Sequence, residues 1–247
     1  MTAPQLLPRP PRRAAYLVPN MFTTGVLFAG FFACVQAVSE RFELAAIAIL
    51  VAMVLDGLDG RVARMTGTQT AFGAEYDSLA DMVAFGAAPA LVMFEWALGG
   101  TGVAGWIAAF VYCAGAALRL ARFNTTIGTI DKRYFQGLPS PAAAALLATF
   151  VLAATEHDVA GPNLAWIASA LAVFAGGTMV SNVLFFSGKD INVRSRWSLV
   201  AAVFFIGLAV MFASHLASIV FTMTFAYVMS GYLFAVVRRL APQGDSS

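Results

Sequence analysis

Residues 56–81 place four aspartates beside one of the most apolar runs of the chain. Placing a carboxylate at a membrane span costs free energy, so a carboxylate found there indicates a function. Asp56 and Asp59 are three residues apart, and Asp77 and Asp81 are four apart. At these spacings each pair would project from one face of a helix, and two facing pairs would form a cage of oxygen ligands. Such a cage suits a hard divalent cation, so we predict that all four aspartates bind Mg²⁺ or Mn²⁺.

Two further residue types accompany the aspartates. Gly60 and Gly73 lack side chains, which allows a neighbouring helix or a ligand to approach closely. Arg64 adds a fixed positive charge that can bind a phosphate group. The segment therefore predicts a site for a metal and a phosphate together.

This arrangement resembles the signature of the CDP-alcohol phosphotransferases, membrane enzymes that move a phosphatidyl group from a CDP-linked lipid to an alcohol. All eight fixed positions of that signature are matched, as Asp56-x2-Asp59-Gly60-x2-Ala63-Arg64-x8-Gly73-x3-Asp77-x3-Asp81. The stretch Pro19–Thr23 also resembles the sequence before the first span in that family. The resemblance implies that the substrate is a CDP-lipid, CDP-diacylglycerol, and that CMP is released.

The resemblance also implies roles for the matched residues. Asp56, Asp59 and Asp77 would be the chief ligands of two metal ions. Asp81 would contact metal as well and would accept the proton of the acceptor hydroxyl. The residues expected to seat the CDP-lipid are Gly60, Ala63, Arg64 and Gly73.

Two later segments, 119–124 and 135–141, resemble the phosphatidylserine synthase branch of this family, which implies L-serine as the acceptor. Serine presents a carboxylate and an ammonium, and an arginine fork beside polar oxygen atoms could hold both. The expected serine-binding residues are Arg122, Arg119, Asn124 and Ser140. Glycerol phosphate, inositol phosphate and choline remain alternative acceptors.

The composition indicates the class of protein that carries these residues. Hydrophobic residues make up 60% of the 247 residues, charged residues make up 11%, and the mean hydropathy is +0.78. A chain this apolar could not cover its surface with polar groups, so a soluble domain is excluded. The sequence predicts an all-α polytopic membrane protein. Cys34 and Cys113 lie in apolar runs, where packing is a better explanation than a disulfide.

About eight transmembrane helices are expected from apolar runs of roughly 20 residues. The second would end in the first half of the aspartate motif, and the third would begin with the second half. The resemblance implies a six-helix catalytic core at 16–190. The apolar runs predict two additional transmembrane helices at 191–240, and cytosolic tails are expected at 1–15 and 241–247. The predicted spans with the clearest limits are 17–38, 82–98, 103–120, 164–186, 197–213 and 216–237.

The basic residues orient this arrangement. Of 15 lysines and arginines, all but Arg41 fall on the side of the N-terminus. The positive-inside rule then places both termini and the aspartates in the cytosol, at the inner (cytoplasmic) membrane of a bacterium. His157 and His215 would lie in external loops, away from the site. Membrane lipids and a second copy of the chain, in a homodimer, are expected partners, and nucleic acid is not.

A cation-coupled transporter is the alternative function from a different class. Carboxylates within membrane spans also occur in cation-coupled transporters. A transporter would place them near the middle of the bilayer, where both sides have access. The four aspartates instead cluster at the predicted cytosolic ends of their helices, which favours the enzyme.

Overall fold

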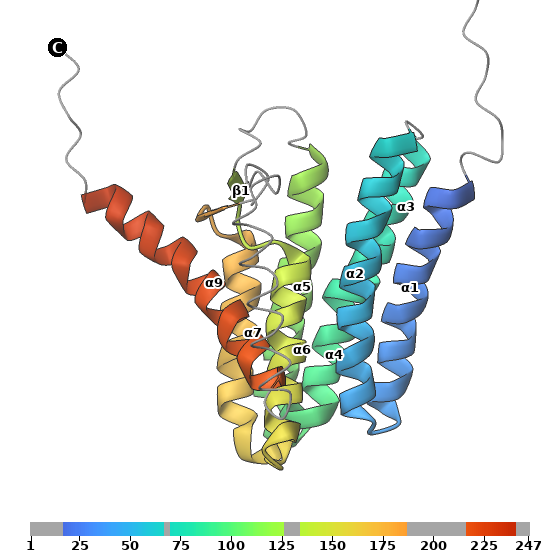
Figure 1. Ribbon diagram of the computed structural model, residues 1–247. Coiled ribbons are helices and arrows are strands. Elements are labelled where there is room, and N and C mark those ends of the chain that lie inside the picture. The colour runs from blue at the N-terminus through green and yellow to red at the C-terminus, as the bar shows by residue number, and fades with distance from the viewer. Residues whose placement is uncertain (1–16, 67–69, 126–133, 187–215, 241–247) are drawn as a thin grey trace, which may run out of the picture.

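The computed structural model describes residues 17–66, 70–125, 134–186 and 216–240. Helices form almost all of this part of the chain (Figure 1). The larger helices are α1 (Leu17–Val38), α2 (Phe42–Thr66), α3 (Ala71–Asp81), α4 (Ala88–Met93), α5 (Val103–Thr125), α6 (Ser140–Glu156), α7 (Ala165–Val180) and α9 (Leu216–Leu240). Shorter elements are the π-helices η2 (Met82–Ala87) and η3 (Phe94–Leu98), the 3₁₀-helices η4 (Gly99–Thr101) and η5 (Gly161–Leu164), and the strands β1 (Tyr134–Gln136) and β2 (Leu184–Phe186).

The predicted all-α polytopic membrane fold is confirmed. Within the described ranges, five helical stretches are long and apolar enough to cross a bilayer: Asn20–Val38, Ala71–Thr101, Val103–Thr125, Gly161–Val180 and Leu216–Val236. α6 is a shorter apolar helix, and α2 combines an apolar first half with the charged motif. The predicted seventh span, 197–213, lies outside the described residues.

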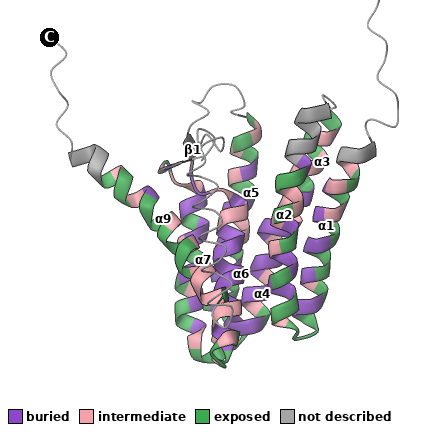
Figure 2. Cartoon of the chain, viewed as in Figure 1, coloured by how far each residue is buried: buried purple, intermediate pink, exposed green. Residues whose placement is uncertain are grey.

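The helices α1 to α7 form an upright bundle, and α9 crosses one side of it obliquely (Figure 1). α1 and α2 form a hairpin, α2 also contacts α6, and α5 packs along α7. Buried residues face the middle of the bundle, while exposed side chains follow the outward faces (Figure 2). Those outward faces carry large apolar side chains such as Phe28, Phe31, Trp106 and Trp166, as expected for surfaces in contact with lipid.

Small residues allow the helices to approach closely, which is the usual basis of helix packing in membranes. Alanine is the commonest member of the buried core. Where α5 meets α7, Gly115 and Gly176 face each other, and a Cβ at Gly115 would lie only 2.5 Å from the Gly176 carbonyl oxygen. A side chain at this position would push the two helices apart.

The predicted sixth span is too long at its C-terminal end. The sequence predicts helix to Phe186, but α7 ends at Val180, and Ser181 adopts an extended conformation. β2 then pairs antiparallel with β1, with Phe135 opposite Phe185. Where the chain leaves the helix, the Ser181 hydroxyl donates to the Thr178 carbonyl oxygen at 2.8 Å. Apolarity alone could not distinguish these last residues from a continuing helix.

Candidate active site

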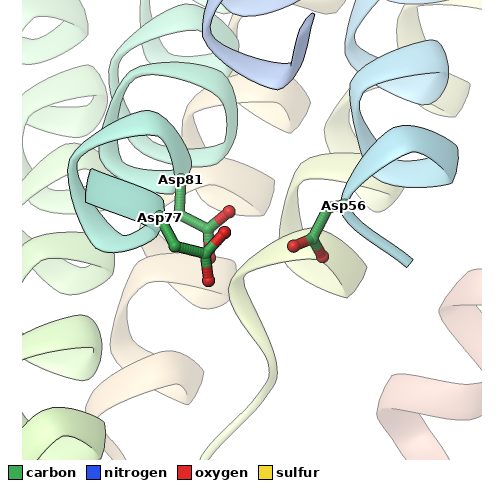
Figure 3. A group of neighbouring side chains, drawn as sticks. All are labelled: Asp56, Asp77 and Asp81. Atoms are coloured by element: carbon green, nitrogen blue, oxygen red, sulfur yellow. The ribbon is translucent and has the colours of Figure 1, made fainter. Parts of the chain in front are cut away.

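Three of the four aspartates come together between α2 and α3. Asp56 projects from α2 toward Asp77 and Asp81, which project from α3 one turn apart (Figure 3). One carboxylate oxygen from each lies within 4.8 Å of the corresponding oxygens of the other two. Three of the four carboxylates of the predicted cage, presented by two facing helices, are therefore close enough to share an ion.

The start of α3 fixes the angle at which Asp77 and Asp81 enter the site. The Thr70 side chain caps the helix by accepting a hydrogen bond from the Gly73 N–H at 2.9 Å. α3 ends at Asp81, and the π-helix η2 begins at the next residue. A π-turn widens the helix and is often found at functional sites. The backbone N–H at Gly73 thus takes part in the helix cap, and the predicted contact of Gly73 with the CDP-lipid stays a prediction.

The fourth aspartate is held slightly apart. Asp59 is buried, and its carboxylate accepts a hydrogen bond from the Thr23 hydroxyl of α1. It remains within electrostatic range of Asp56 and Asp77. Sequence reasoning missed Thr23 as a site residue, although the resemblance at Pro19–Thr23 pointed to this end of α1.

The three clustered carboxylates fit a divalent cation. Asp81 Oδ1 is buried and has no hydrogen-bond partner among the described residues. A buried acceptor without a partner is costly, and three like charges at this separation repel one another. A hard cation would satisfy the free oxygen and offset the repulsion, and carboxylate oxygens are the ligands it prefers.

Arg119 interacts electrostatically with this cluster. Arg119 lies on α5, which continues past its predicted end at Leu120 to Thr125. Its Nη1 donates to the Ser140 hydroxyl at 2.8 Å, and Ser140 is fully buried at the start of α6. The guanidinium lies within electrostatic range of Asp56 and Asp81. Two of the predicted serine-binding residues, Arg119 and Ser140, are therefore in contact with each other.

The other two predicted serine-binding residues lie further along α5. The Asn124 side-chain amide donates to the Ser78 hydroxyl at 2.9 Å, which joins α5 to α3 next to Asp77. Arg122 instead reaches the end of α7, where its Nη1 lies 3.4 Å from the Ser181 carbonyl oxygen and 3.3 Å from Asn182 Oδ1. The structure thus brings Asn124 beside the aspartate helix and directs Arg122 toward the loop after α7.

The residues of α2 that are predicted to contact phosphate have a described backbone but no described side chains. Gly60, Ala63 and Arg64 continue the helix that carries Asp56. Lys132 and Arg133, expected in a basic loop, are outside the described residues. His157 lies at the other end of the bundle, where it follows α6 and its Nε2 is 3.0 Å from the Ser218 hydroxyl.

Comparison with known proteins identifies the family. The model of the CDP-alcohol phosphatidyltransferase family matches residues 16–180, which include all the aspartates. The chain belongs to the CDP-alcohol phosphatidyltransferase family. A relative from Helicobacter pylori, named CDP-diacylglycerol–serine O-phosphatidyltransferase, is 33% identical over 240 residues, which cover 96% of this chain and all of the relative.

Relatives from two other organisms have the same name. The protein from Mycobacterium leprae is 42% identical over 140 residues, covering 54% of this chain and 46% of the relative. That from Methanocaldococcus jannaschii is 38% identical over 135 residues, covering 55% and 60% respectively. The region of this chain that matches the family model includes the carboxylate cluster, Arg119 and Ser140. Helix α9 lies outside that region.

Proposed function

We propose that this phosphatidyltransferase moves the phosphatidyl group of CDP-diacylglycerol to L-serine, giving phosphatidylserine and CMP. The observation that carries the proposal is the cluster of Asp56, Asp77 and Asp81 with Arg119 beside it. Carboxylates supply the metal ligands and the base, and the guanidinium supplies a partner for a carboxylate on the acceptor. The names of the relatives support serine as that acceptor.

The proposed reaction is a single displacement. The serine hydroxyl oxygen attacks the lipid-side phosphorus, a new P–O bond forms, and the bond between that phosphorus and the oxygen bridging to CMP breaks. The hydroxyl proton passes to Asp81, whose Oδ1 is buried without a hydrogen-bond partner among the described residues. CMP leaves with the bridging oxygen, so no covalent enzyme intermediate is required.

Asp56, Asp77 and Asp81 would hold Mg²⁺ or Mn²⁺, with Asp59 beside them, and two ions are predicted. When bound, these ions neutralise the diphosphate of the CDP-lipid and the charge that develops on CMP. The chain itself contributes the fixed positions of the carboxylates: α2 presents Asp56, and the capped α3 presents Asp77 and Asp81. Gly60, Ala63, Arg64 and Gly73 are proposed to seat the cytidine diphosphate.

Arg119 is the proposed anchor of the serine carboxylate. The carboxylate of serine is only a few bonds from its hydroxyl, so a serine that reacts at Asp81 must be held by a cation close to Asp81. Arg119 lies within electrostatic range of Asp81, whereas Arg122 is directed toward Ser181 and Asn182. A planar guanidinium can bind a carboxylate through two N–H groups, and Ser140 fixes its orientation.

The site is proposed to face the cytosol, where serine and CMP are available in solution. The distribution of basic residues supports this orientation and a location in the inner membrane. The homodimer stays a prediction.

The proposal is tested by CMP release from purified protein in detergent with CDP-diacylglycerol. We expect release that requires L-serine, stops with a metal chelator and returns with added Mg²⁺ or Mn²⁺. Glycerol phosphate, inositol phosphate and choline, each offered in place of serine, are the comparison acceptors. Release that is faster with one of these than with serine would overturn the assignment of the acceptor.

A further inference from the structure

The helix that carries Asp81 does not continue as a regular α-helix past this residue. α3 ends at Asp81, and the next six residues form the π-helix η2, after which the Ala88 N–H donates to the carbonyl oxygen of Val83, five residues earlier. A regular α-helix pairs each N–H with the carbonyl four residues earlier. The turn directly after the candidate base therefore holds one residue more than an α-helical turn would.

Pro89 gives a physical reason for this wider turn. A regular α-helix would pair the Phe85 carbonyl with the N–H of residue 89, but proline has no N–H, and its ring clashes with the carbonyl four residues earlier. Phe85 and Pro89 are both buried, where a backbone carbonyl needs a partner from the protein. The Tyr112 hydroxyl of α5 donates to the Phe85 carbonyl oxygen at 2.9 Å, and the Tyr112 side chain is fully buried. The donor that Pro89 cannot supply thus comes from a neighbouring helix.

Close packing holds η2 on two sides. From α1, a Cβ at Gly30 would lie only 2.6 Å from the Ala84 Cα. From α5, the Ala116 Cβ lies 3.2 Å from the position that a Cβ at Gly86 would occupy. Small residues therefore let α1 and α5 approach η2 closely, and the Tyr112 hydroxyl adds a polar contact to this packing.

We propose that Tyr112 is a positioning residue of the active site: its hydrogen bond to Phe85 keeps the π-turn open and so sets the direction in which Asp81 points. This inference rests on the proposed function, in which Asp81 accepts the serine proton. If η2 closed into an α-helix, the residues before it would turn relative to those after it by about 100° and shift by about 1.5 Å. Asp81 would then be displaced from the cluster that it forms with Asp56. Tyr112 acts through the backbone of η2 and needs no contact with the substrate.

The test is Tyr112→Phe in the full-length protein, with Tyr232→Phe as the matched control. Both changes remove one hydroxyl and keep the ring. The Tyr232 hydroxyl lies 2.6 Å from the Thr178 hydroxyl, so its removal takes a hydrogen bond from the contact between α9 and α7, which does not involve η2. For Tyr112→Phe we expect kcat to fall by about 10- to 100-fold with both KM values within about twofold of wild type, because a displacement of about 1 Å can cost a factor of about 100. For Tyr232→Phe we expect a lower thermal midpoint in detergent and an unchanged kcat.

A double variant separates positioning from stability. Pro89→Ala supplies the N–H that the Phe85 carbonyl lacks, so Tyr112→Phe combined with Pro89→Ala should regain the thermal midpoint that Tyr112→Phe loses. The helix of the double variant can close by α-helical pairing, so we expect its kcat to stay low. A kcat that recovers together with the thermal midpoint would show that Tyr112 only stabilises the fold, and would overturn the inference. A normal kcat in Tyr112→Phe alone would overturn it as well.

The double variant also decides the matter if Tyr112→Phe does not fold, because the Phe85 carbonyl then has a backbone donor. These outcomes differ from a failure of the proposed function. Wild-type protein that releases CMP with another alcohol but not with serine would refute the proposed acceptor. The same variants assayed with that alcohol would then decide the role of Tyr112, since Asp81 would be the base for any hydroxyl. Wild-type protein that releases no CMP with any of the acceptors would overturn both proposals.

Discussion

Arg119→Lys is the sharpest single change at the acceptor site, because it keeps the charge and removes the planar fork. Arg119 Nη1 donates to the buried Ser140 hydroxyl at 2.8 Å, and a lysine ammonium could not hold Ser140 and a substrate carboxylate in the same geometry. Losing one hydrogen bond to a charged group costs about 1.5–3 kcal/mol. At about 1.4 kcal/mol for each factor of ten, the serine KM should rise about 10- to 150-fold.

The assay is serine-dependent CMP release at saturating CDP-diacylglycerol, followed by a titration of each substrate. The CDP-diacylglycerol KM should stay close to wild type. Arg122→Lys is the matched control on the same helix: its contacts with Ser181 and Asn182 are 3.4 and 3.3 Å long, so the serine KM should change by less than about fivefold. An Arg122→Lys enzyme with the larger serine KM defect would show that we have assigned the carboxylate to the wrong arginine.

Three further changes probe the proposed base, the partner of Asp59 and the α5–α7 packing, and a fourth serves as the control for the packing. Asp81→Asn should lower kcat by about 100- to 10,000-fold, because an amide cannot accept the serine proton, while the amide oxygen can still contact a metal and CDP-lipid binding, measured at equilibrium, is retained; an equal loss of binding would show that Asp81 acts only as a metal ligand and not as the base. Thr23→Val should destabilise the protein by about 1–3 kcal/mol, seen as a lower thermal midpoint, because it removes the hydrogen-bond donor to the buried Asp59. Gly176→Ala should also lower the thermal midpoint, since its Cβ would lie 2.7 Å from a backbone oxygen of α5. Gly177→Ala, with no atom within 4 Å of its Cβ, should not, and equal effects of the two would contradict the close α5–α7 contact.

The spacing of the aspartates was sufficient to predict the central part of the site. Asp77 and Asp81 recur at a helical interval, so a single helix had to present both, and the expected facing helix carries Asp56. Hydrophobic runs likewise predicted the positions of most described helices, because a span must be apolar for about 20 residues. Both signals are local and regular, which is why they could be found without a structure.

Other features depend on contacts between distant parts of the chain. The end of α7 is set by the pairing of β2 with β1, and the partner of Asp59 comes from α1. The sequence places Arg119 and Arg122 within one turn of the same helix, so it could not show which one faces the carboxylates.

The most direct test of the carboxylate cluster is Mn²⁺ binding, followed by electron paramagnetic resonance, in parallel with CMP release. The variants are wild type, Asp56→Ala and, as a control, Glu43→Ala, which changes an exposed acidic residue at the other end of the same helix. We expect wild type and Glu43→Ala to bind Mn²⁺ and to release CMP with serine, and Asp56→Ala to lose both together, because alanine removes every oxygen that one of the three clustered carboxylates offers to the ion. An Asp56→Ala protein that titrates Mn²⁺ as wild type does would contradict the metal site at this cluster.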